Sequence, residues 1–393
     1  MKGIKRVAAA VAGLSVAAAL IGSGVAVADP NPSNGPSPRP LQGMGSDTIQ
    51  SVMDGISEVA LSGGNPLIAS WDVGGPGFST RSTGCAFTAN GTAGNPATSA
   101  FTDGQRSNGS GNGVKQLNAS MTPGDPYFGC TDFARASSVQ GAQTYGMTYI
   151  PFAQDAVAFA VTNVSNIPKE LSLADLHAIY TCQYPGFTTV QNSSGQWVTT
   201  QYHALLPQAG SGTRKFFLAS IGVTDPGTTN SASTGCLSDQ KTRTGLGGTN
   251  IIEEHKGNVL DDNSIVPISV AQYISQSEGI ITDYRGRAVL GTIVDANSTG
   301  ATAPALFSLP MTLNNTYGFL SSGTPTLNAP LNRLVYNVVP TDNLAQSNIQ
   351  TAFVGSNSLV CQQSNVIAEY GFGVLNSSSA KPCGDTTTTT AGN

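Results

Sequence analysis

Residues 208–214 read Gln-Ala-Gly-Ser-Gly-Thr-Arg, and a helical pattern over residues 215–221 follows at once. Such a turn exposes backbone N–H groups at the positive end of a helix dipole, beside two hydroxyls and a guanidinium. Two further turns, at 45–48 and 109–113, also bear hydroxyls and precede helical patterns. Each of the three could therefore bind an anion. Apolar runs typical of buried strands alternate with these helices at 149–152, 156–161 and 334–339. The sequence predicts a layered α/β fold.

Apolar spacing predicts further helices over residues 48–61 and along the face formed by Val270, Tyr273 and Ile274. Ser172 followed by Asp175 is a capping box, so a helix should begin there and continue to Tyr180. A last helix is expected over residues 359–370, before Gly371.

The first 28 residues have the features of a secretory signal. Three basic residues precede an apolar run at 7–21, and Ala26-Val27-Ala28 matches the small-x-small cleavage pattern. We expect cleavage after Ala28, no lipid anchor because no cysteine follows closely, and a secreted, extracellular or periplasmic protein. Residues 29–40 contain five prolines and predict an extended lead-in, and residues 386–393 predict a polar tail.

An even number of cysteines in an exported chain favours disulfides. We expect them to pair in sequence order, as Cys85–Cys130, Cys182–Cys236 and Cys361–Cys383. The spacing C-x-x-C does not occur, so we expect no zinc or other metal and no cofactor. Acidic residues outnumber basic ones by 23 to 18, and no basic stripe is interleaved with aromatics, which argues against a nucleic-acid partner.

Several short segments occur in an order that resembles the phosphate-binding component of bacterial phosphate ABC transporters, a class of solute-binding proteins. The segments are Gly45-Ser46-Asp47-Thr48, Gly109-Ser110, residues 113–117, Thr131-Asp132-Phe133-Ala134, residues 151–157, residues 171–176, Ser211-Gly212-Thr213 and residues 368–372. Together they extend through most of the chain that follows the signal.

This resemblance implies an α/β fold of the type II periplasmic-binding-protein kind, with two lobes and a ligand cleft between them. Lobe one would comprise residues 41–158 and 336–385, and lobe two residues 159–335. Two crossover strands would join the lobes near 156–161 and 334–339. The resemblance further implies phosphate or a similar oxyanion as ligand, an ABC permease as partner, and a monomer that is not an enzyme.

Carried over position by position, the resemblance implies ligand contacts from all three turns. The implied set is Ser46, Asp47, Thr48, Ser110, Arg135, Ser137, Ser211, Gly212, Thr213 and Arg214.

Two departures concern the charges of the implied site. The family has an aspartate shortly after the position of Phe133, where this chain has Ser137 and Ser138. It also has an arginine before Ser-Gly-Thr, where this chain has Pro207 and Gln208. Arg135 or Arg214 could replace that arginine. Without the aspartate, the site loses a built-in rejection of fully deprotonated oxyanions such as sulfate.

Two other functions stay open at the level of sequence. A phosphate-ester hydrolase would need a nucleophile and base, and Ser211 with His203, eight residues earlier, is a conceivable pair. The G-x-S-x-G, H-E-x-x-H and P-loop patterns do not occur. A secreted adhesion, matrix or scavenging protein could also reuse the same fold. We expect capture of phosphate or a related oxyanion without catalysis, for ABC-type uptake.

Overall fold

The computed structural model describes most of the chain that follows the expected signal. The described residues are 29–31, 34, 38–73, 106–125, 127–187, 190–191, 197–198, 202–227, 236–242, 249–293, 307–308, 312–313 and 331–392. The expected signal at 1–28 and Cys85 lie outside them. No helix within these ranges is long and apolar enough to cross a membrane.

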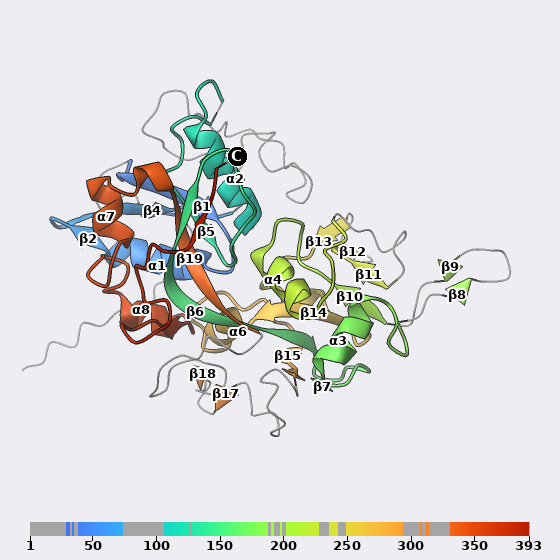
Figure 1. Cartoon of the computed structure of the whole chain (residues 1–393). Helices are drawn as coiled ribbons and strands as arrows, with labels where there is room; N and C mark the ends of the chain where they lie inside the picture. Colours follow the sequence, from blue (N-terminus) through green and yellow to red (C-terminus); the bar gives the residue numbers. More distant parts are fainter. Residues whose placement is uncertain are drawn as a thin grey trace, which may run out of the picture.

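A continuous sheet passes through the whole molecule (Figure 1). Within the described ranges, the strand order is β11-β10-β14-β6-β19-β5-β1-β4, with β15, β20 and β21 also paired to β6. The bounds are β1 Leu41–Gly45, β4 Ile68–Ser70, β5 Phe133–Ala136, β6 Met147–Thr162, β10 His203–Leu205, β11 Leu237–Ser238, β14 Ser264–Ser269, β15 Ala288–Leu290, β19 Asn332–Pro340, β20 Gly373–Val374 and β21 Thr389–Thr390.

Strands β6 and β19 connect the two ends of this sheet. The separate strands expected at 149–152 and 156–161 are one strand of 16 residues, because Ala153, Gln154 and Asp155 pair with β19 and only a register shift beside them interrupts the ladder. The first half of β6 pairs with β20 and β21, and the second half pairs with β14 and β15. The expected pair of strands joining two lobes is therefore present, and the α/β fold class is confirmed.

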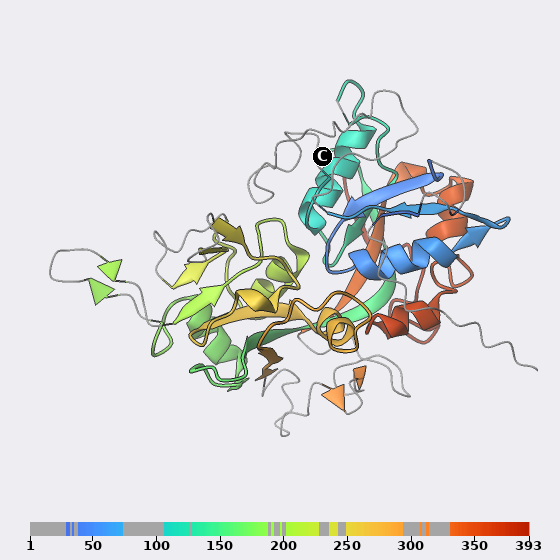
Figure 2. The same cartoon turned by 180° about the vertical axis from the view of Figure 1, so that it is seen from behind.

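Helices divide between the two ends of the sheet, as Figures 1 and 2 show from opposite sides. Lobe one has α1 Gln50–Val59, α2 Ser110–Met121, α7 Ser347–Phe353 and α8 Ser364–Glu369. Lobe two has α3 Leu173–Tyr180 and α4 Gly212–Ser220, and α6 Val270–Ser277 lies at the junction. The 3₁₀ turns are η1 Gly257–Val259 and η3 Thr341–Asn343. Five two-stranded ladders complete the described elements: β2 Leu61–Ser62 with β3 Asn65–Pro66, β7 Glu170–Leu171 with β16 Thr292–Ile293, β8 Val190–Gln191 with β9 Trp197–Val198, β12 Gln240–Thr242 with β13 Thr249–Ile251, and β17 Phe307–Ser308 with β18 Thr312–Leu313.

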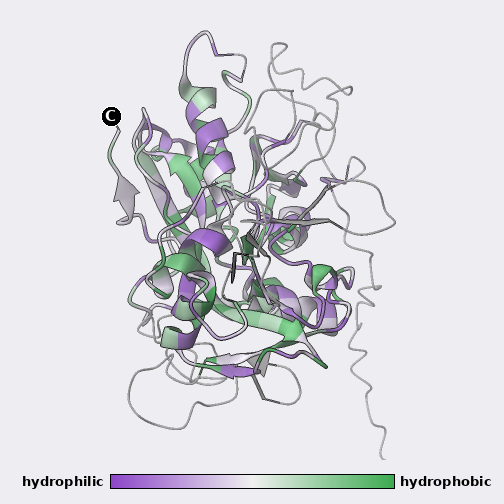
Figure 3. Cartoon of the chain, turned by 90° about the vertical axis from the view of Figure 1, so that its right-hand side faces the viewer, coloured by the Kyte–Doolittle hydropathy of each residue, from purple (hydrophilic) through white to green (hydrophobic). Residues whose placement is uncertain are grey.

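Each lobe has its own apolar core. In lobe one, α1 contributes Val52, Met53 and Ile56, which pack with Phe133 of β5 and Phe353 of α7. In lobe two, side chains of α3 and α4 pack on the second half of β6. Burying one such side chain contributes about 1.5–3 kcal/mol. Figure 3 shows the corresponding pattern, with hydrophobic stretches along the central strands and hydrophilic stretches on the helices.

Local sequence signals explain where several helices begin. Ser172 accepts a hydrogen bond from the Asp175 amide, and the Asp175 carboxylate accepts one from the Ser172 amide, so the expected capping box is present. Ser211 caps α4 by accepting from the Arg214 amide at 3.0 Å. The expected last helix at 359–370 is shorter than predicted, because turns occupy residues 359–363 and α8 begins only at Ser364.

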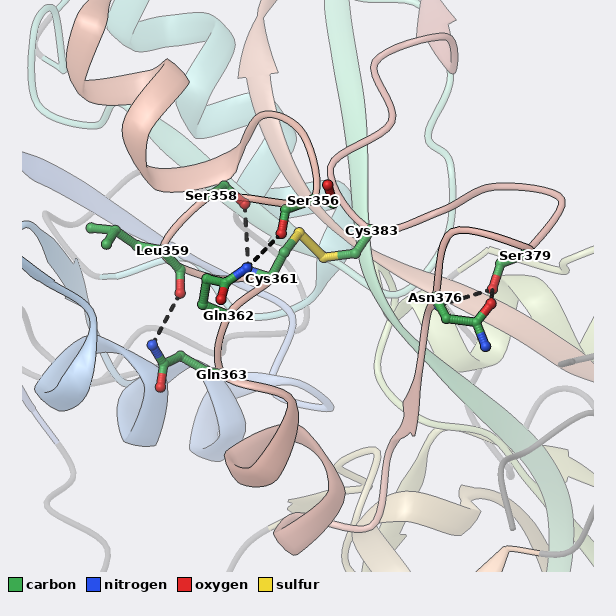
Figure 4. Close-up of a disulfide and its surroundings, with 9 residues drawn as sticks. All are labelled: Ser356, Ser358, Leu359, Cys361, Gln362, Gln363, Asn376, Ser379 and Cys383. Atoms are coloured by element: carbon green, nitrogen blue, oxygen red, sulfur yellow. Dashed lines mark hydrogen bonds between the residues drawn. A yellow bond between two sulfur atoms is a disulfide. The ribbon is translucent and has the colours of Figure 1, made fainter. Parts of the chain in front are cut away.

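Two expected disulfides are confirmed, one in each lobe. Cys182 is bonded to Cys236 in lobe two, and Cys361 to Cys383 in lobe one. Figure 4 shows the second with its surroundings, where Ser358 accepts a hydrogen bond from the Cys361 amide. Cys130 is also disulfide-bonded. Its expected partner Cys85 lies outside the described residues.

The C-terminal residues are ordered against the sheet and do not form the loose polar tail that composition predicts. Thr389 and Thr390 pair with Thr148 and Met147 of β6. The Tyr149 amide donates to the Thr388 carbonyl at 2.8 Å. Backbone hydrogen bonds, which composition does not encode, account for this order.

Candidate functional site

The three hydroxyl-bearing glycine turns meet between the lobes. The Gly109 amide donates to the Gly45 carbonyl at 3.0 Å, which joins the two turns of lobe one. The Gly111 amide donates to the Gly210 carbonyl at 3.0 Å, which joins them to the turn of lobe two. The beginnings of α1, α2 and α4 therefore converge, an arrangement that the sequence can suggest only through the family resemblance.

Glycine is required where the lobes touch. A Cβ on Gly212 would lie 2.3 Å from the hydroxyl oxygens of both Ser110 and Ser137. Gly109 has φ of 90°, and a Cβ there would lie 2.7 Å from the Gly210 carbonyl oxygen. A larger residue at Gly109 would push the two turns apart, whereas one at Gly212 would displace the two serine hydroxyls.

Six buried hydroxyl residues surround this contact, and we call them the interlobe donor site: Ser46, Thr48, Ser110, Ser137, Ser211 and Thr213. None is more than 2% exposed. The Ser137 hydroxyl lies 3.1 Å from that of Ser46 and 3.2 Å from that of Ser110. The Thr48 and Thr213 hydroxyls lie 3.1 Å apart and join lobe one to lobe two.

A carboxyl group of the chain itself lies among these donors. Glu254 accepts hydrogen bonds from the Thr48 hydroxyl, from the Thr48 amide at 3.3 Å and from the Thr213 amide at 3.4 Å. Burial and, second, the neighbouring Asp47 carboxyl raise the pKa of Glu254 to about 8, although Arg333 and Ser211 act in the opposite direction. Glu254 therefore carries a proton at neutral pH. No motif in the sequence marks this residue.

The cation nearest to the donor site is Arg333 of β19, which the sequence analysis also missed. Its Nη2 donates to the Thr213 hydroxyl at 2.9 Å and pairs with Asp155 of β6 at 2.7 Å. Asp155 also accepts from the Ser269 hydroxyl and the Ala271 amide. Arg333 Nη1 is buried and has no hydrogen-bond partner within the described residues. A buried guanidinium thus offers one unused donor beside the site.

Arg214 is directed into lobe two. Its guanidinium is fully buried, pairs with Asp225 at 2.7 Å and Asp239 at 3.0 Å, and donates to the Pro207 carbonyl at 3.1 Å. These contacts anchor the first turn of α4 to the loops that follow it.

Arg135 also makes contacts within its own lobe. It donates to the Ser70 hydroxyl at 2.7 Å, to the Trp71 carbonyl at 2.8 Å and to the Ser46 carbonyl at 3.2 Å. Burial lowers the pKa of this guanidinium. Its hydrogen bond to the Ser46 carbonyl holds the backbone of the 45–48 turn in place.

Asp47 interacts with Glu254 of the donor site and also lines a cavity of about 190 Å³ between the lobes. Lobe one lines this cavity with Asp47, Asp54 and Asp72, and His255 and Tyr284 line it from the other side. Burial raises the pKa of Asp54 well above its usual range and that of Asp72 to about 6. We call this space the acid cavity.

Asp47, Glu253 and His255 place ligand-type atoms within 4.8 Å of one another. His255 Nδ1 lies 3.1 Å from Asp47 Oδ2, and Lys256 forms an ion pair with Glu253. Burial lowers the pKa of His255. These partners account for the cluster within the chain, and we assign no metal ion to it.

No protein-family model matches the chain, and no curated protein matches it either. Solved structures of similar fold include a protein described as a phosphate ABC transporter substrate-binding protein, with bound phosphate, from Clostridium perfringens. It is 15% identical, with a TM-score of 0.46, and the match covers 86% of this chain and 99% of that one.

An ABC-type phosphate transport receptor from Vibrio cholerae is 14% identical, with a TM-score of 0.43, over 84% of this chain and 98% of that one. A phosphate-binding protein from Stenotrophomonas maltophilia is 13% identical, with a TM-score of 0.40, over 86% and 90%. The two lobes of this chain are defined by its own strand order.

Proposed function

We propose that this protein binds an inorganic oxyanion, phosphate or a close relative, at the interlobe donor site, and that it does so without catalysis. The observation that carries the proposal is the convergence of three hydroxyl-bearing turns, two of which also donate hydrogen bonds to a buried carboxyl group. An amide from each lobe and the Thr48 hydroxyl of lobe one already donate to Glu254. Donors that converge on one carboxyl group are suited to the oxygens of another anion.

The geometry favours a small tetrahedral anion over a larger organic ligand. The donors lie within hydrogen-bond distance of one another, as the 3.1 Å between the Thr48 and Thr213 hydroxyls shows. They approach from three directions, at the beginnings of α1, α2 and α4. Helices α2 and α4 direct the positive ends of their dipoles at the site, and Arg333 Nη1 adds an unused charged donor.

The proposed ligand residues differ in part from those that the family resemblance implies. Ser46, Thr48, Ser110, Ser137, Ser211, Gly212 and Thr213 stay in the proposed set, and Arg333 joins them. We propose structural roles for Arg135 and Arg214 because their guanidinium groups are used by other partners. Asp47 would act through the charge that it places beside Glu254.

The signal-like N-terminus and the family resemblance support export followed by delivery of the ligand to an ABC permease, with the protein acting as a monomer. In the adhesion, matrix or scavenging alternative, the donor site would have no inorganic ligand. In the hydrolase alternative, a bound ester would be cleaved. One set of measurements separates the three.

Calorimetric titration of protein that has been unfolded, stripped of ligand and refolded should give saturable binding of phosphate and arsenate. The same protein should release no nitrophenol from p-nitrophenyl phosphate. Absence of heat with phosphate, arsenate and sulfate alike would contradict the proposal. Ester turnover that disappears in Ser211→Ala would favour the hydrolase.

Replacing Thr213 by Val tests the site directly, because it keeps the side-chain shape and removes one hydroxyl. We expect phosphate affinity to fall by about 10- to 100-fold, the usual cost of a lost hydrogen bond to a charged group. The matched control is Thr351→Val, at an exposed threonine on α7. Equal affinities in the two variants would place the ligand elsewhere.

A further inference from the structure

We infer that Glu254 is a specificity-determining residue of the donor site, an internal competitor that an oxyanion must displace and that yields more readily when protonated. This inference rests on the proposed function, because it concerns the same donors. It couples ligand binding to a proton held on the protein.

The contacts show the competition. Glu254 uses the Thr48 hydroxyl and amide from lobe one and the Thr213 amide from lobe two. An oxyanion that takes the donors of both lobes needs these same groups. Since an amide N–H makes one strong hydrogen bond, the carboxyl group and the ion cannot both keep their full set.

The charged groups around Glu254 determine the free energy that its ionisation would require. From its own segment, Glu253 is paired with Lys256, and His255 hydrogen-bonds to Asp47. From the β1–α1 turn, Asp47 adds a like charge. The remaining charged groups that face Glu254 are Arg333 of β19 and, paired with it, Asp155 of β6.

Arg333 is thus already shared with one carboxylate, and no second described cation pairs with Glu254. A buried site containing Asp47, an ionised Glu254 and an oxyanion would be strongly under-neutralised, which is costly at low dielectric. Burial and Asp47 raise the pKa of Glu254 to about 8, so the group is neutral over the physiological range.

The consequence is a pH-dependent affinity that originates in the protein. An ionised Glu254 accepts hydrogen bonds more strongly and repels the ligand, so binding of an anion favours the protonated form. Because linkage is reciprocal, affinity should stay level below about pH 8 and then fall, toward tenfold per pH unit for one coupled proton.

Sulfate is the probe of choice, because its charge does not change between pH 6.5 and 9.5. Calorimetric affinities for sulfate and phosphate would be measured across this range for the wild type, for Glu254→Gln and for the control Glu278→Gln, an exposed glutamate at the end of α6. For phosphate, the ratio of wild type to variant cancels the ligand's own titration.

We expect the wild type and Glu278→Gln to lose affinity above about pH 8, and Glu254→Gln to stay level and bind more tightly there, by tenfold or more at pH 9.5. Glu254→Ala should bind more tightly at every pH. Parallel pH profiles for wild type and Glu254→Gln would overturn the inference while leaving the proposed function intact. Absence of sulfate and phosphate binding in all four proteins would overturn both.

A measurement on the wild type alone covers the case in which the variants fail to fold. With ¹³C-labelled glutamate carboxyls, one resonance should titrate with a midpoint near 8, and sulfate should shift that midpoint upward. A midpoint that does not move on adding saturating sulfate would contradict the inference.

Discussion

The residues of one short turn face two opposite environments. Ser46 and Thr48 turn their hydroxyls to the interlobe donor site, whereas Asp47 between them lies against the acid cavity. The donor site consists of neutral hydroxyls with their amides, bordered by the Arg333 guanidinium and the single carboxyl group of Glu254. The cavity contains the carboxyl groups of Asp47, Asp54 and Asp72. A single turn therefore separates a surface suited to anions from one that repels them.

The difference teaches that a carboxyl group of the cavity can act on the donor site through its charge, as Asp47 does on Glu254. Within the described residues, one oxygen each of Asp47, Asp54 and Asp72 is buried without a hydrogen-bond partner. The donor-site hydroxyls, by contrast, bond to one another. The charge of Asp47 is one of the causes that raise the pKa of Glu254, so the cavity helps to keep that group protonated.

The largest effect on phosphate affinity is expected from Gly212→Ala, which changes the donor site and leaves the acid cavity as it is. Its Cβ would lie 2.3 Å from the Ser110 and Ser137 hydroxyl oxygens, so both hydroxyls would have to leave their positions in the donor site. We expect phosphate affinity to fall by more than 100-fold, because two hydrogen-bond donors are displaced together.

Gly141→Ala is the matched control, because nothing lies within 4 Å of a Cβ at that position. It should bind phosphate as the wild type does. Full affinity in Gly212→Ala would mean that the Ser110 and Ser137 hydroxyls are not needed for binding.

An effect of intermediate size, on stability, is expected at Glu254, which contacts the donor site and is influenced by Asp47 of the acid cavity. Its pKa rises from an ordinary 4.5 to about 8 on folding, so the unfolded chain releases a proton that the folded protein keeps. The free energy of unfolding should therefore fall as pH rises from 4.5 to 8 and level off above that.

Glu254→Gln lacks this titration and should be the more stable protein at pH 8, on the order of 3 kcal/mol. Urea unfolding at several pH values measures the difference. The same difference at pH 4.5 and pH 8 would show that Glu254 is ionised in the folded protein.

The smallest effect is expected inside the acid cavity, from Asp72→Asn. Burial raises the pKa of Asp72 to about 6 from an ordinary 3.8, so its charge costs stability as pH rises between these values. Above pH 6 the free energy of unfolding of the variant should exceed that of the wild type. The difference should be only about 1 kcal/mol, because solvent screens this partly exposed group. Phosphate affinity should not change. Asp342→Asn, at an exposed acid of η3, is the control, and reduced affinity in Asp72→Asn alone would show that the cavity takes part in binding.

Features that depend on local sequence could be predicted. The capping box of Ser172 and Asp175 and the helix after Ser211 follow from residues near one another in the chain, and the two disulfides follow from pairing the cysteines in sequence order. Their chemistry is decided within a few residues or by a count of cysteines. The meeting of the three turns was predictable only through the family resemblance.

Direction of side chains and distant partners could not be predicted. Thr213 and Arg214 are adjacent, yet one joins the donor site and the other is held by Asp225 and Asp239. Glu254 lies 41 residues beyond its partner Thr213 with no motif around it.

One feature of the sequence could have identified Arg333 in advance. Arg333 comes directly before the apolar run 334–339, and Asp155 comes directly before the apolar run 156–161. Opposite charges beside two buried strands indicate a buried ion pair.

The two described disulfides each lie within a single lobe. Cys182–Cys236 ties α3 to β11, and Cys361–Cys383 ties the segment before α8 to the chain beyond β20. Neither crosses between the halves, so oxidation makes each lobe stiffer as a rigid body and leaves their relative rotation to the backbone of β6 and β19. Reducing agents would then loosen each lobe without changing the freedom of β6 and β19, the strands that join the lobes. A crosslink engineered between the two lobes would be needed to hold them in one relative orientation.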